Sequence, residues 1–187
     1  MSGLDRIERL RAAKRGVPAN VAGAAPVLRR QLEAEQQGTA AEVTEADRIQ
    51  ARRLLAILEI AFLAAAADGE LSDVEIVNLG NSISSWLGGE ISVENIATVL
   101  DRFAAVFADQ GFEARLGFAA EALDPEGARE AYTLSCILLA CDTDVREEEL
   151  GALGDIADAL QIPEEEAQAR FDEIHDAIQD AAASLPA

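Results

Sequence analysis

The chain has 187 residues, of which 50% are hydrophobic and only 4% aromatic, and its formal net charge is −20. This length is enough to bury one core, filled mainly by Ala, Leu, Ile and Val. A chain this acidic repels nucleic acid and anionic lipid, so we expect neither as a main partner. Abundant Ala, Leu, Glu and Arg, with few β-branched runs, favour helices over strands.

The basic residues are concentrated at the start of the chain. Residues 1–53 contain ten Lys or Arg and seven Asp or Glu, a net charge of +3, whereas the remaining residues carry −23. Leu4, Ile7 and Leu10 repeat at helical spacing among five basic residues. This pattern predicts a short basic amphipathic helix, which we expect to dock on the acidic body or on a partner protein.

A second short helix is expected from Pro26 to about Gln37, because proline is favoured at the first helical position. A linker follows. We interpret residues 1–43 as a basic N-terminal arm outside the core, and residues 44–187 as one all-helical domain.

The chain has no feature that predicts export or membrane insertion. Its first residues lack the continuous apolar core of a signal peptide, and the longest apolar run, residues 54–67, is too short to span a bilayer. We therefore expect a soluble, cytoplasmic protein. Cys136 and Cys141 form no CxxC pair, so buried free thiols are expected rather than a disulfide.

The body reads as a series of helices. The segment from Glu45 to about Ala67 becomes apolar nearly all round from Leu54, which is typical of a central helix surrounded by others. No segment alternates with period two over a useful length. The predicted fold is all-α, a bundle of about seven to nine helices. The later helices are expected over residues 73–87, after Ser92, from Phe112, from Pro125, over residues 147–160 and from Pro163.

One acidic turn occurs twice. AAAADGELSDVE at residues 64–75 returns, with changes, as ACDTDVREEE at residues 140–149. In both copies an apolar helix runs into a carboxylate-rich turn and the next helix begins at once, which predicts two pseudo-symmetric halves. At a fixed offset the aligned acids are Asp68 with Asp142, Glu70 with Asp144, Asp73 with Glu147, and Glu75 with Glu149.

Helix capping explains part of this pattern. Ser72 and Glu75 form a capping-box sequence, and Asp73 suits the positive end of the helix dipole. Capping does not explain Asp68 or Glu70, because Asp68 lies at a helix C-terminus, where an anion is disfavoured. A bound hard cation, Ca²⁺ or Mg²⁺, would offset the repulsion among these carboxylates. The alternative is a solvated charged face.

The two turns also resemble a known family. ADGELSDVE after an apolar helix resembles the tellurite-resistance TerB-like family, and CDTDVREEELGALGDIADALQI is similar to the family's later acidic motif. The resemblance covers about residues 46–178. It implies an all-helical, non-enzymatic module that binds metal through these turns and acts in stress-response assemblies near the membrane, with at most peripheral membrane contact. Thr143 and Arg146 depart from the first motif and weaken the second site.

Three functions stay open from the sequence. The first is the cation-binding module, with all eight aligned acids as ligands. The second is an acidic scaffold that binds a basic protein partner without a specific ion. The third, a carboxylate hydrolase, lacks any substrate-binding pattern, and no catalytic residue is assigned. A homo-oligomer is compatible with these readings. His175 has no sequence partner for catalysis, and Trp86 is expected to pack in the core.

Overall fold

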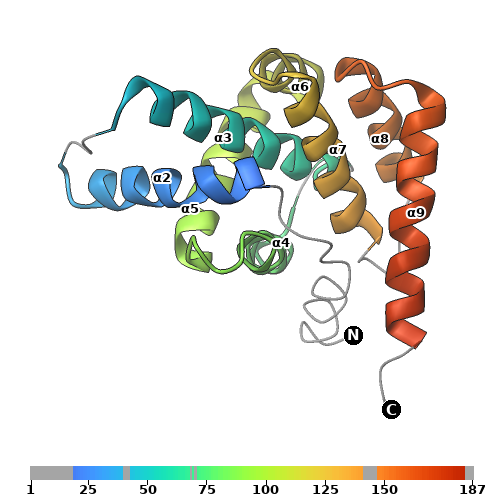
Figure 1. Cartoon of the computed structure of the whole chain (residues 1–187), viewed down its shortest axis with the longest axis horizontal. Coiled ribbons are helices and arrows are strands. Elements are labelled where there is room, and N and C mark those ends of the chain that lie inside the picture. Colours follow the sequence, from blue (N-terminus) through green and yellow to red (C-terminus); the bar gives the residue numbers. More distant parts are fainter. Residues whose placement is uncertain (1–18, 40–42, 68, 70, 141–146, 184–187) are drawn as a thin grey trace.

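The described part of the chain is an all-helical bundle (Figure 1). The computed structural model describes residues 19–39, 43–67, 69, 71–140 and 147–183. These ranges contain eight helices and no strand, which confirms the predicted fold class. The helices are α2 (Ala19–Gln36), α3 (Glu45–Ala65), α4 (Asp73–Trp86), α5 (Val93–Gln110), α6 (Phe112–Glu121), α7 (Pro125–Ala140), α8 (Glu147–Ala159) and α9 (Glu164–Ala183).

Helix α3 lies at the centre of the bundle, as predicted. It packs against α2, α5, α6, α7 and α8, and every residue from 56 to 64 is buried. Such a helix is stable only when it is covered on all sides, because its apolar residues are not confined to one stripe. None of the described helices is long and apolar enough to cross a membrane.

Side-chain caps set several of the helix starts. The hydroxyl of Thr44 accepts a hydrogen bond from the Asp47 amide at 3.1 Å, and the Asp47 carboxylate accepts one from the Thr44 amide at 3.0 Å. Asp124 accepts a hydrogen bond from the Gly127 amide at 2.8 Å. These bonds satisfy amides that have no partner within the helix, so the helices begin where the sequence predicts.

The two halves of the bundle follow the sequence repeat. Helices α4 and α8 begin at Asp73 and Glu147, which the repeat aligns. Each is followed by a longer helix that packs on it, α5 in the first half and α9 in the second. Aligned core positions agree as well, since Leu79 and Leu153 are both buried. The halves meet where α3 packs along α7.

Helix α2 differs from the prediction. It begins at Ala19 rather than at Pro26, because the preceding Ala-rich sequence has a high helix propensity and the helix continues through the proline. Val21, Leu28 and Leu32 are buried in the same core as α3. The expectation that this stretch lies outside the core is therefore wrong for α2. The basic helix expected around Leu4, Ile7 and Leu10 lies outside the described residues.

Candidate functional site

The first acidic turn connects α3 to α4. The Ala66 amide closes α3 by donating to the Phe62 carbonyl, and the Gly69 amide donates to the Ala66 carbonyl at 3.0 Å. Gly69 has a φ of 110°, in the region that favours glycine, as expected at the end of this helix. Asp68 and Glu70, the two acids that capping does not explain, lie outside the described residues.

Ser72 and Glu75 form the predicted capping box. The Glu75 Oε2 atom accepts hydrogen bonds from the Ser72 amide at 2.8 Å and from the Ser72 hydroxyl at 2.7 Å. The Glu75 amide in turn donates to the Ser72 hydroxyl at 3.3 Å. Helix capping thus accounts for the direction of the Glu75 carboxylate, and Asp73 beside it is exposed to solvent.

The second acidic turn connects α7 to α8. Asp142 and Asp144 lie outside the described residues, whereas Glu147 is exposed and Glu149 half-buried in the first turn of α8. Within the described ranges, no group of three or more His, Cys, Asp or Glu side chains is placed to hold a metal ion. Because half of the predicted ligands lie outside those ranges, both cation sites remain predictions.

A buried ion pair joins α3 to α6. Glu59 lies in the middle of the apolar run of α3 and is only 6% exposed. Its Oε1 atom accepts a hydrogen bond from Nε of Arg115 at 2.7 Å and forms an ion pair with Nη2 at 2.5 Å. Burial raises the pKa of Glu59 above its usual value of 4.5, and the hydrogen bonds from Arg115 oppose that shift. No sequence motif marks Glu59, although a lone carboxylate in an apolar helix predicts a cationic partner.

A second arginine cluster joins α3 to the start of α7. The Arg53 Nη2 atom lies 3.2 Å from Glu130, which is buried, 3.4 Å from Asp124 and 3.8 Å from Glu126. Its Nε atom is buried and has no hydrogen-bond partner among the described residues. Gly127 makes this approach possible, because a Cβ atom there would lie 2.9 Å from Arg53 Nε.

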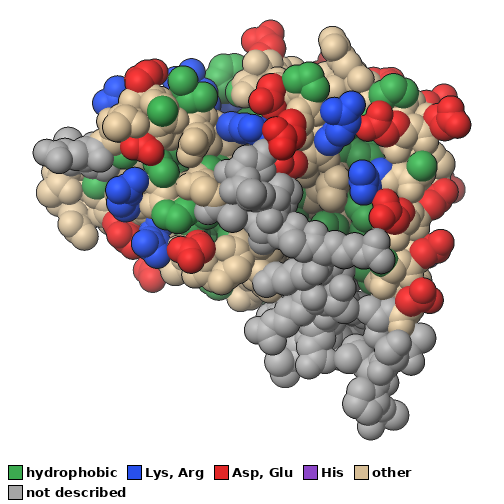
Figure 2. All heavy atoms as spheres, in the orientation of Figure 1, with side chains coloured by type: hydrophobic (Ala, Val, Ile, Leu, Met, Phe, Trp, Pro, Cys, Tyr) green, Lys and Arg blue, Asp and Glu red, His purple; other side chains and the backbone are tan. Residues whose placement is uncertain are grey.

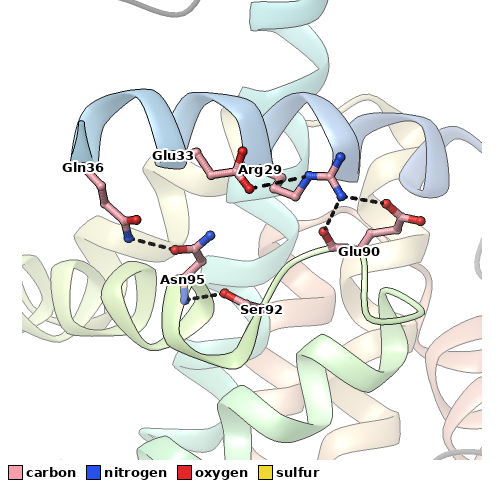
Figure 3. Close-up of polar contacts among 6 residues, drawn as sticks. All are labelled: Arg29, Glu33, Gln36, Glu90, Ser92 and Asn95. Atoms are coloured by element: carbon pink, nitrogen blue, oxygen red, sulfur yellow. Dashed lines mark hydrogen bonds and ion pairs between the residues drawn. The ribbon is translucent and has the colours of Figure 1, made fainter. Parts of the chain in front are cut away.

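Polar contacts fasten α2 to the start of α5 (Figure 3). Nη1 of Arg29 lies 3.5 Å from both the carbonyl and the carboxylate of Glu90, in the connection between α4 and α5. Gln36 donates to the Asn95 side chain at 2.8 Å, and the Asn95 amide donates to the Ser92 hydroxyl at 3.2 Å. Because Asn95 is buried, Gln36 supplies a partner that this side chain needs.

A cavity of about 200 Å³ lies between α2 and α3. Among its lining residues only Arg53 is charged, and Arg53 already pairs with three carboxylates. The cavity therefore offers mainly an aliphatic surface. It is lined by Val21, Gly23, Ala24, Gln50, Arg53, Leu54 and Ile57.

The structure describes three of the four other residues discussed in the sequence. His175 is half-buried and stacks on Phe171 at 6.0 Å between ring centroids. Trp86 is buried, as predicted. Cys136 is a buried free thiol, and burial raises its pKa to about 12, so little reactive thiolate forms near neutral pH. Cys141 lies outside the described residues.

Comparison with protein-family models, curated proteins and solved structures finds no match for this chain. The resemblance to the TerB-like family therefore rests on the two sequence motifs alone.

Replacing Gly127 by alanine is expected to destabilise the fold by about 1–3 kcal/mol, because the added methyl group overlaps Arg53 Nε and displaces it from Glu130. Gly117 on α6 is the matched control, since an added Cβ there meets no atom within 4 Å. Gly117→Ala should stabilise by about 0.5–1 kcal/mol through helix propensity. Urea unfolding measures both changes, and equal effects of the two substitutions would contradict the close approach.

Glu59→Leu is expected to cost about 3 kcal/mol in the free energy of unfolding, because it leaves the Arg115 guanidinium buried without its counter-charge. The double variant Glu59→Leu, Arg115→Met should recover most of this loss, since apolar replacements often match a buried ion pair. Urea unfolding of the wild type, both single variants and the double variant gives the coupling energy. Additive losses would show that the two side chains do not depend on each other.

Proposed function

We propose that this protein is a non-enzymatic, TerB-like module that binds a hard divalent cation, Ca²⁺ or Mg²⁺, at its two acidic turns. The ligands of the first site are drawn from Asp68, Glu70, Asp73 and Glu75. Those of the second, weaker site are drawn from Asp142, Asp144, Glu147 and Glu149.

The observation that carries this proposal is the repeated position of the acidic turn in the fold. In each half the turn follows a buried apolar helix, α3 or α7, and ends at the first residue of the next helix. Asp73 and Glu147 begin α4 and α8 at aligned positions. These two acids therefore begin their helices at equivalent places, which supports a ligand bound where each of these helices starts.

The chemistry of the turns favours a hard ion. Carboxylate oxygens are the ligands of Ca²⁺ and Mg²⁺, whereas zinc and copper favour nitrogen and sulfur. An ion held between the end of one helix and the start of the next would offset the repulsion among the carboxylates and set the angle between the helices. The TerB-like resemblance further implies a role in a stress-response assembly.

A second candidate is an acidic scaffold that binds a basic protein partner without a specific ion. Helices α8 and α9 together contain twelve Asp or Glu residues and one Arg. Figure 2 shows acidic side chains gathered along the edge of the molecule where these helices lie. Such a surface attracts basic segments, and added salt shortens the range of this attraction.

Calorimetric titration of the metal-stripped protein with Ca²⁺ and Mg²⁺ tests the first proposal. We expect saturable binding, and the double variant Asp68→Asn, Glu75→Gln should lose at least about tenfold in affinity at the first site, or about 1.4 kcal/mol. Glutamine at position 75 keeps a capping oxygen, so α4 should remain folded. Asp101→Asn, Asp109→Asn is the matched control, because it removes two exposed charges from α5 and should leave binding unchanged.

The two candidates predict different outcomes in this titration. Weak heat that moderate salt abolishes, and that both double variants reduce equally, would mean that the acidic turns are solvated helix ends. The scaffold function would then be favoured, and the search would turn to basic protein partners.

A further inference from the structure

The first two turns of α4 expose an apolar surface. Val74 is 68% exposed and Val77 is 51% exposed, and they lie three residues apart on one face of the helix. Leu71 and Ile76 beside them are half-buried. The second half of the helix is instead buried against the core at Leu79 and Ile83. We call the exposed face formed by Val74 and Val77 the α4 face.

The second half of the protein shows that the fold does not require these valines. The repeat places Glu148 and Gly151 of α8 at the positions of Val74 and Val77. Both are exposed, and neither presents an aliphatic side chain to solvent. At these two positions the first copy is thus aliphatic and the second is not, although Leu150 between them is 45% exposed. An exposed aliphatic pair with no structural need favours a contact with another segment.

The negative charge around the α4 face indicates that the contacting segment is basic. Asp73 and Glu75 are exposed in the same turns of α4, and the chain after residue 53 carries a net charge of −23. A segment with an apolar stripe and basic flanks would bury the valines and place its cations beside these carboxylates.

The chain carries such a segment itself. Leu4, Ile7 and Leu10 fall on one face if the segment is helical, and the flanking basic residues are Arg6, Arg9, Arg11, Lys14 and Arg15. The segment is joined to the body at Ala19, the first residue of α2. If residues 4–15 form a helix, that helix is about 18 Å long, and the three residues between it and α2 add about 10 Å when extended. The covalent link also raises its effective concentration to about the millimolar range.

We propose that residues 4–15 of this chain dock as an amphipathic helix on the α4 face, with Leu4, Ile7 and Leu10 against Val74 and Val77. The contact is intramolecular, and its basic residues would compete with the proposed ion for Asp73 and Glu75.

Limited trypsin digestion of the full chain in buffer with EDTA tests this contact, because cleavage at Arg6, Arg9, Arg11, Lys14 and Arg15 is slow while the segment is docked. We expect Val74→Gln, Val77→Gln to raise the initial cleavage rate at these positions several-fold. Raising the salt concentration should accelerate the same cleavages in the wild type. Mass spectrometry of the early fragments gives the rates, and EDTA removes any effect of a divalent ion.

Ile49→Gln is the matched control, because Ile49 is 62% exposed on α3 and is not part of the α4 face. It should leave the cleavage rate unchanged. Equal rates in the wild type and in the double variant would overturn the proposal. A wild-type dimer that the double variant dissociates, without any change in cleavage rate, would assign the α4 face to a second copy and would also overturn it.

Discussion

The complete burial of residues 56–64 of α3 is the constraint on which the rest of the structure depends. A helix segment that is covered on all sides can carry a charged residue only where a neighbouring helix supplies the opposite charge. Glu59 meets this requirement through Arg115 of α6, and Arg53 meets it through Glu130 and Asp124 at the start of α7. These pairs give little net stability by themselves, but any shift of α6 or α7 along α3 would leave a buried charge without its partner.

This arrangement also fixes the helix ends that precede the two acidic turns in the sequence. Helices α3 and α7 pack along each other and end at Ala65 and Ala140. The same buried contact therefore sets the position of both helix ends. Helix α2 adds to this frame, since its apolar side covers α3 while Gln36 and Arg29 bind the start of α5 and the connection before it. The described candidate ligands lie in the first turns of α4 and α8, outside this core.

Much of the fold could be predicted because the signals are local. The capping residues Thr44 and Ser72 and the apolar run of α3 each specify a helix without reference to distant residues. The role of α2 could not be predicted, because a Gly- and Ala-rich stretch before Pro26 carries no periodic pattern and gains its stability from burial against α3. The pairing of Glu59 with Arg115 is a contact between distant segments, so only the need for some partner is visible in the sequence. At the first candidate site the sequence predicts the capping role of Glu75, which the structure confirms. Ion binding at the two turns stays a prediction.

The central claim is that the two acidic turns bind divalent ions at aligned places in the two halves. The most direct test is an NMR titration of the full-length, ¹⁵N-labelled protein with Ca²⁺ in about 0.15 M salt, where long-range attraction between exposed charges is largely screened. The account predicts saturable shifts in the amides of Gly69, Leu71 and Ser72 and of residues 142–149, with the first turn saturating at the lower concentration. Small, non-saturating shifts spread over the exposed acids of α8 and α9 would contradict it.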